Sequence, residues 1–211
     1  MNSIKPQIWV LLDDREGNRQ QCLGVAEALG LPYEIKEIRF NFLKFLPNYL
    51  LGASFFSLKS PKSDLQSQFP DLVIAAGRRS APVSQKIKKS SERKTKILQI
   101  MWPEFTNTRY FDLIAVPSHD CAKKARNIIQ IKGAPHALNP QIEKKLRQTW
   151  RPKLLDYPTP RIALIIGGSS RHKTFSLKMG LKLAELASKM AISVGGTLLI
   201  ISSPRSGDIG R

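Results

Sequence analysis

Short apolar runs alternate with amphipathic stretches along most of the chain. Runs such as 8–12 and 113–116 contain only apolar residues, which is typical of strands buried on both faces of a parallel sheet. By this pattern we expect strands at 8–12, 34–39, 71–76, 96–101, 113–116 and 128–131. Strands that alternate with helices imply right-handed crossovers, so the pattern predicts an α/β fold with a doubly wound parallel sheet.

The stretches between these runs contain helix signals. Cys22, Val25 and Ala26 follow one another at helical spacing, and Gly30 stands where a C-cap glycine belongs. Pro82 lies shortly after the third strand, at a position where the first turn of a helix tolerates proline. Each predicted strand is therefore followed by a segment that can return the chain to the opposite edge of the sheet.

A second α/β unit begins after a segment with three prolines, 151–160, which is typical of an interdomain connector. A strand at 161–166, a helix over about 175–191 and a strand at 197–201 follow it. We therefore predict a complete Rossmann-like domain at 1–150, a connector at 151–160 and the first βαβ unit of another such domain at 161–211.

Composition narrows the class of protein. A hydrophobic content of 42% supports a packed core, and Cys22 and Cys121 make no disulfide framework. The start lacks a signal-peptide pattern, and no run reaches the roughly 20 apolar residues that span a bilayer. We therefore predict a cytoplasmic protein with reduced thiols that is able to associate with a membrane surface.

The formal net charge of +18 favours polyanionic partners such as phosphorylated ligands or acidic lipids. The densest basic clusters, 86–89 and 93–96, also fit a solvated helix face and loop. The chain has no RRM, KH or helix-turn-helix signature, which argues against a nucleic-acid partner. The sequence identifies no protein partner.

The segment 39–62 is rich in Phe and Leu, and all of its charges are cationic. Pro47 and Lys44 argue against a spanning helix. The pattern predicts an apolar, basic surface element that lies on an anionic membrane. The alternative is a helix buried between the sheet and a domain interface.

Polar residues follow the first and third predicted strands. Asp14, Gly17 and Asn18 come after 8–12, in a turn that suits close approach of a phosphate or sugar, or that is an ordinary strand-to-helix turn. Arg78 and Arg79 follow 71–76, where open α/β sheets place ligands, and they could hold a phosphate or pair with nearby carboxylates.

His119 and Asp120 follow the strand at 113–116, and we predict them as catalytic residues, with His119 as a general base; an ordinary hydrogen-bonded loop histidine is the alternative. After the strand at 161–166 comes a small-residue loop that suits a diphosphate and contains Gly167, Gly168, Ser169 and Ser170. The histidines and cysteines lack metal-ligand spacing, so we predict no metal site.

These motifs together resemble those of the mitochondrial fission factor family of plants, known as "elongated mitochondria", and its bacterial relatives. The resemblance covers nearly the whole chain in the same order and is carried by 12–21, 23–30, 70–79, 116–120, Asn127, 133–136 and 165–170. The family is similar to two-domain glycosyltransferases of the B fold type (GT-B), and its bacterial members have been described as nucleoside-diphosphate-sugar epimerases.

The resemblance implies a GT-B-like fold, no cofactor, and a nucleotide-sugar ligand for a glycosyltransferase-like enzyme at a membrane surface. Its alternative is a non-catalytic adaptor that recruits protein partners. The family continues well past this length, and 203–211 diverge from the relatives as a frameshift or split gene would produce. We therefore expect a truncated chain, for which an inactive fragment is a further reading.

Overall fold

The computed structural model describes residues 5–59, 63–66, 68–120, 124–169 and 174–202. It divides into two compact units, Met1–Leu138 and Asn139–Arg211. In the part that is described, no helix is long and apolar enough to cross a membrane.

The first unit is built on a parallel sheet of six strands in the order β2-β1-β3-β4-β5-β6. The strands are β1 Ile8–Leu12, β2 Glu34–Glu37, β3 Leu72–Ala76, β4 Lys96–Ile100, β5 Leu113–Pro117 and β6 Ile128–Ile131. All six were predicted from the sequence, to within two residues at each end. The α/β class and the parallel Rossmann-like sheet are therefore confirmed.

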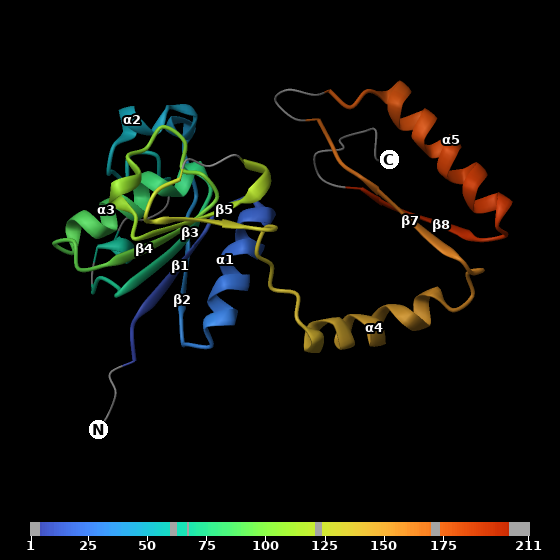
Figure 1. Ribbon diagram of the computed structural model, residues 1–211, viewed down its shortest axis with the longest axis horizontal. Helices are drawn as coiled ribbons and strands as arrows, with labels where there is room; N and C mark the ends of the chain where they lie inside the picture. The colour runs from blue at the N-terminus through green and yellow to red at the C-terminus, as the bar shows by residue number, and fades with distance from the viewer. Residues whose placement is uncertain (1–4, 60–62, 67, 121–123, 170–173, 203–211) are drawn as a thin grey trace. The chain divides into compact units, whose positions relative to one another are not determined.

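Alternate residues of β1 face opposite sides of this sheet, and each side has its own core. Trp9 and Leu11 pack in a cluster with Val83 and Ile87 of α3 (Ala81–Ser90). Ile8, Val10 and Leu12 pack instead with Cys22 and Ala26 of α1 (Glu16–Leu29). Helices α1 and α3 therefore cover opposite faces of the sheet (Figure 1). Because both faces are covered, all of β1 is buried.

The predicted helix signals are present. Gly30 ends α1 with a left-handed φ of 64°, and its N–H donates to the carbonyl oxygen of Glu27. Pro82 lies in the first turn of α3, as its sequence position predicted.

The chain between β2 and β3 makes a closed loop, which we call the apolar loop and define as residues 40–58. Phe40 and Leu58 form an antiparallel bridge at its base. The loop contains the 3-10 helix η1 (Phe42–Phe45) and the single turn α2 (Asn48–Leu51), and η2 (Ser63–Leu65) follows it. The apolar loop makes up most of the segment 39–62, which the sequence predicted as a membrane-binding element. It consists of short helical turns rather than one long helix.

Further 3-10 turns lie in the loops next to strands of the first unit. They are η3 (Arg78–Ser80) after β3, η4 (Thr108–Tyr110) before β5 and η5 (Ser118–Asp120) after β5. Two of them, η3 and η5, hold the residues that the sequence placed at the carboxyl ends of strands.

The second unit contains α4 (Pro140–Leu154), β7 (Arg161–Ile166), α5 (Leu177–Ser193) and β8 (Thr197–Ser202). β7 and β8 are parallel neighbours, so they form the single βαβ unit that the sequence predicted. Helix α4 was not predicted, and its last turn includes residues 151–154 of the expected proline-rich connector. Along the chain, the boundary between the two compact units falls between residues 138 and 139, whereas the sequence predicted a connector at 151–160.

Candidate functional site

The candidate site lies at the carboxyl edge of the sheet, between β1 and β3. The order β2-β1-β3 means that the chain leaves β1 in one direction and later returns to its other side. Open α/β sheets bind ligands at such a switch point, because the two following loops diverge there. The residues after β1 and β3 are therefore the first to consider.

Asp13 is the first residue after β1, and only 3% of it is exposed. Its carboxylate accepts hydrogen bonds from the Arg15 N–H at 3.1 Å and from Asn18 Nδ2 at 2.9 Å. Burial raises the pKa of Asp13 from its usual value, although both hydrogen bonds act in the opposite direction. A buried carboxyl group with a raised pKa at a ligand-binding edge is a marker of a functional site.

The Asn18 side chain also closes the gap between α1 and the end of β3. A Cβ added to Gly77 would lie 2.9 Å from Asn18 Nδ2, and Gly77 has φ 77° and ψ 171°. Only glycine adopts this conformation readily. Asn18 therefore lies next to the turn that follows β3, and its side-chain amide holds the Asp13 carboxylate in position.

Asp14 and Arg79 connect the two strand ends directly. Arg79 Nη1 lies 3.2 Å from Asp14 Oδ1, and Lys44 Nζ lies 3.8 Å from Asp14 Oδ2. The Arg79 side chain is 14% exposed and that of Asp14 is 51% exposed. Burial is the main cause that lowers the pKa of Arg79, with Arg15 adding to it. The predicted residues Asp14 and Arg79 therefore meet at the switch point.

Arg78 has a different environment from its neighbour. Its guanidinium donates to the carbonyl oxygens of Lys44 at 2.7 Å and Leu46 at 2.8 Å. Its own carbonyl oxygen accepts a hydrogen bond from Asn48 Nδ2 at 2.9 Å. These contacts show that Arg78 holds the apolar loop in place, and its predicted contact with a ligand stays a prediction.

A cavity of about 430 Å³ opens beside Asp13 and Asp14, on the β2 side of β1. Across it, Arg19 makes a bidentate ion pair with Glu37, with distances of 2.7 and 2.9 Å. The hydrogen bond from Arg19 lowers the pKa of Glu37. The lining residues are Asp13, Asp14, Arg19, Glu37, Ile38, Arg39, Phe40 and Lys59. The cavity thus combines carboxylates with cations, which suits a ligand that has both hydroxyl and phosphate groups.

His119 and Asp120 lie at the same edge of the sheet, after β5, and β4 separates them from β3. His119 Nε2 lies 3.7 Å from Asp120 Oδ1, and the side chains are 70% and 33% exposed. A histidine this exposed is accessible to a substrate hydroxyl. The distance is too long for a hydrogen bond.

Gly17 lies in the first turn of α1, since the helix begins at Glu16. Nothing lies within 4 Å of a Cβ added there, so the fold does not require this glycine. In the second unit, Gly167, Gly168 and Ser169 follow β7, and Ser169 Oγ accepts a hydrogen bond from the Phe175 N–H at 2.9 Å. Ser170 lies outside the described residues.

Two buried amides at this edge were not predicted. Gln99, on β4, is fully buried and donates to the carbonyl oxygens of Gly77 at 3.0 Å and Ile100 at 3.1 Å. Asn48 is 3% exposed and donates to Arg78, Glu104 and Thr106. Glutamine in a strand and asparagine in a loop are common, so only tertiary structure distinguishes these two.

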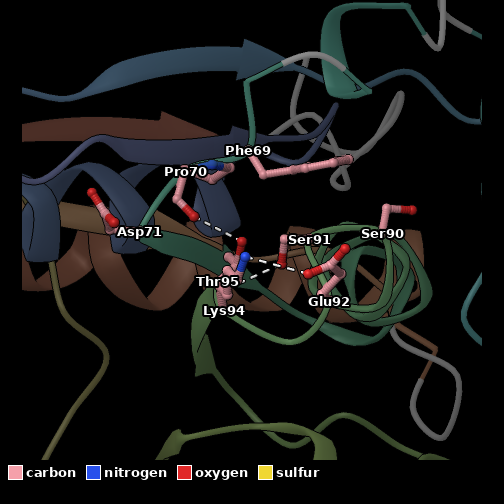
Figure 2. A pocket seen from close by; sticks show the side chains of 8 residues that line it. All are labelled: Phe69, Pro70, Asp71, Ser90, Ser91, Glu92, Lys94 and Thr95. Carbon is pink, nitrogen blue, oxygen red and sulfur yellow. Dashed lines mark hydrogen bonds and ion pairs between the residues drawn. The ribbon is translucent and has the colours of Figure 1, made fainter.

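A cavity of about 400 Å³ lies at the opposite, amino edge of the sheet (Figure 2). There Thr95 Oγ1 donates to the Pro70 carbonyl oxygen at 2.7 Å, and the Thr95 N–H donates to Ser91 Oγ at 3.1 Å. These bonds join the end of α3 to the starts of β3 and β4. These hydrogen bonds satisfy the hydroxyl and the N–H of Thr95 within the protein, which indicates that Thr95 has a structural role here.

Comparison with known proteins places these features in a family. A model of the family described as Mitochondrial fission ELM1 matches residues 16–209. The uncharacterized protein RP120 of Rickettsia prowazekii (strain Madrid E) is 38% identical over 117 residues, which are 54% of this chain and 32% of that protein. The chain therefore matches about a third of the length of this curated relative.

Among solved structures, UDP-N-acetylglucosamine 2-epimerase from Rickettsia bellii has a TM-score of 0.46 and 13% sequence identity to this chain. The superposition covers 97% of this chain and 65% of that one.

Proposed function

The chain belongs to the Mitochondrial fission ELM1 family, and we propose that it binds a nucleoside-diphosphate sugar at the carboxyl edge of its six-stranded sheet. The pair of Asp14 and Arg79 at the β1/β3 switch point is the observation that carries this proposal. An arginine at such a point offers planar donors to a phosphate.

The geometry of this pair suits exchange of one anion for another. The distances from Asp14 to Arg79 and Lys44 are 3.2 and 3.8 Å, and the Asp14 side chain is half exposed. A ligand phosphate can take the place of the Asp14 carboxylate, because Arg79 itself is held by its burial. Asp14 is then free to accept a hydrogen bond from a sugar hydroxyl.

If the bound sugar is transferred, His119 is our proposed general base. An acceptor hydroxyl replaces the diphosphate on the sugar carbon, His119 takes the hydroxyl proton, and the nucleoside diphosphate leaves with the bonding electron pair. Asp120, 3.7 Å away, stabilises the imidazolium that forms. Cations at the site stabilise the leaving diphosphate. In the second unit, the loop of Gly167, Gly168, Ser169 and Ser170 stays a prediction for diphosphate binding.

Calorimetric titration with UDP-N-acetylglucosamine tests the binding site. We expect saturable binding that is weakened about tenfold or more in Arg79→Gln, since a charge-assisted phosphate contact is lost. Lys94→Gln is the matched control, because Lys94 has the same charge and lies at the amino edge with 81% of its side chain exposed. Failure of the folded protein to bind UDP-sugars, or equal weakening in both variants, would refute the proposal.

A second candidate function rests on the apolar loop. Five of its apolar side chains are more than 60% exposed: Phe42 77%, Phe45 71%, Tyr49 67%, Leu50 62% and Phe56 66%. Exposed apolar groups in one short segment mark an interaction surface. The cations at Arg39, Lys44 and Lys59 complement an anionic membrane, so a peripheral membrane function is our second proposal.

Sedimentation with phosphatidylserine vesicles tests the second candidate. Phe42→Ser with Phe45→Ser should reduce the bound fraction, whereas Leu155→Ser with Tyr157→Ser removes exposed apolar groups elsewhere and should not. No vesicle binding by the parent protein would refute the membrane proposal. It would leave the non-catalytic adaptor, which the same exposed surface also suits, as the alternative to sugar-nucleotide binding.

A further inference from the structure

A further cavity in the first unit lies beside the C-terminal half of α3 and has a volume of about 680 Å³. Its lining combines four cations with three further polar side chains and one alanine: Lys88, Lys89, Arg93, Arg109, Gln85, Asn107, Tyr110 and Ala53. We call it the basic pocket. None of its lining residues is acidic, and none belongs to the site between β1 and β3.

The charge of this pocket is largely uncompensated. Lys88 Nζ lies 2.5 Å from Asp112 Oδ2, so one of the four cations is neutralised. Within the described parts of the chain, Lys89, Arg93 and Arg109 make no ion pair with a carboxylate. The C-terminus of α3 supplies only about half a negative charge. A positive charge of more than two units therefore remains beside the pocket.

Gln85 adds a buried donor that has no acceptor. Only 5% of this residue is exposed, and its Nε2 is buried without a hydrogen-bond partner. Buried amide donors are nearly always satisfied, because an unpaired one has lost its water without compensation. Because Gln85 is also one of the lining residues, a ligand oxygen in the pocket can supply the missing acceptor once the side chain turns toward it.

Short turns hold the backbones of the two arginines. The Arg93 N–H donates to the Lys88 carbonyl oxygen at 2.8 Å, and Arg93 has a left-handed φ of 67°. Asn107 Oδ1 accepts a hydrogen bond from the Arg109 N–H at 3.0 Å. The two guanidinium groups therefore extend from backbone positions that hydrogen bonds hold in place, and this reduces the entropy lost when an anion binds.

We propose that the basic pocket binds a ligand with several phosphate groups. Arginine and lysine are the usual partners of phosphate, and a volume of about 680 Å³ suits a small molecule better than a single phosphate ion. Gln85 donates to a phosphate oxygen, while Lys89, Arg93 and Arg109 balance its charge. Both soluble polyphosphates and phosphorylated lipid headgroups have this chemistry. The inference does not rest on the site between β1 and β3.

The test uses one probe for each source: tripolyphosphate by calorimetry, and phosphatidylcholine vesicles with phosphatidylinositol bisphosphate by sedimentation. Arg93→Gln with Arg109→Gln should weaken binding of the relevant probe by about tenfold or more. The control pair, Lys94→Gln with Arg126→Gln, removes the same charge from outside the pocket and should change affinity less than about twofold. Arg79→Gln should leave this binding unchanged, whatever it does to UDP-sugars.

Gln85→Leu separates a binding role from a structural one. The amide makes no hydrogen bond through Nε2, so the substitution should keep or raise the midpoint of urea unfolding while it weakens probe binding. Tripolyphosphate binding with these responses supports a soluble ligand, and binding only to the vesicles supports a lipid headgroup. The proposal is overturned if neither probe binds, or if the control pair weakens binding as much as the pocket variants.

Discussion

Asn18 Nδ2 occupies the space beside Gly77, 2.9 Å from the position that a Cβ would take there. The same amide donates to Asp13, so one side chain joins the end of β1, the first turn of α1 and the end of β3. The contact requires both the small size of Gly77 and its positive φ of 77°. The shape of the candidate site thus depends on a residue that has no side chain.

Gly77→Ala should destabilise the protein by about 2 kcal/mol or more, since alanine is strained at this φ and its methyl group meets Asn18. Urea unfolding followed by circular dichroism measures the change. Gly133→Ala is the control, because nothing lies within 4 Å of a Cβ there and it should cost little. Equal stability of the two variants would contradict the contact.

Two glycines of α1 should respond to alanine in opposite directions. Gly17→Ala should stabilise the protein by about 0.5–1 kcal/mol, the usual gain in a helix, since a Cβ there is unobstructed. A Cβ at Gly24 would lie 2.3 Å from the carbonyl carbon of His136, so Gly24→Ala should destabilise. Thermal unfolding of both variants measures the difference, and stabilisation by both would show that α1 does not pack on 136.

Asp13→Asn should remove a pH-dependent part of the stability. Burial raises the pKa of Asp13 in the folded state above its ordinary value of 3.8, so on raising the pH the unfolded state loses this proton first. The free energy of unfolding of the parent protein should therefore fall, relative to Asp13→Asn, as pH rises from 3.8 through the raised pKa. Urea unfolding of both proteins across this range tests the sign, and parallel pH profiles would contradict it.

Cys22 should be unreactive in the folded protein. It is fully buried, and desolvation together with the charge of Asp13 raises the pKa of its thiol to about 12. In a Cys121→Ser background, iodoacetamide at neutral pH should label Cys22 only as fast as the protein opens. Labelling in urea is the control. Reaction of the folded protein at the rate of a free thiol would show that α1 is not packed as described.

The strands could be predicted because their pattern is local. Residues 8–12 were located at their observed bounds, since a parallel strand that is buried on both faces leaves a continuous apolar run. Helix α4 was not predicted, although Ile142, Leu146 and Trp150 recur at every fourth residue and form an apolar stripe along it. The proline at 152 favoured a connector instead, but it lies in the last turn of the helix.

The candidate site was predicted only as a set of strand ends. Adjacent residues Arg78 and Arg79 look alike in the sequence, but the η3 turn directs one guanidinium to loop carbonyls and the other to Asp14. The importance of Asp13 lay in its burial, which no local pattern reports. The basic pocket was visible in part, as the clusters at 86–89 and 93–96, but Arg109 joins it only through the fold.

The bridge between Phe40 and Leu58 has a consequence for how this protein can diverge. Because the two ends of the apolar loop are already joined, lengthening or exchanging the residues between them adds little closure entropy. The residues between Phe40 and Leu58 can therefore be lengthened or exchanged while β2 and β3 keep their pairing with β1. The hydrogen bonds between Arg78 and the loop residues Lys44, Leu46 and Asn48 tie the loop to η3, so an exchange of loop residues has to keep them.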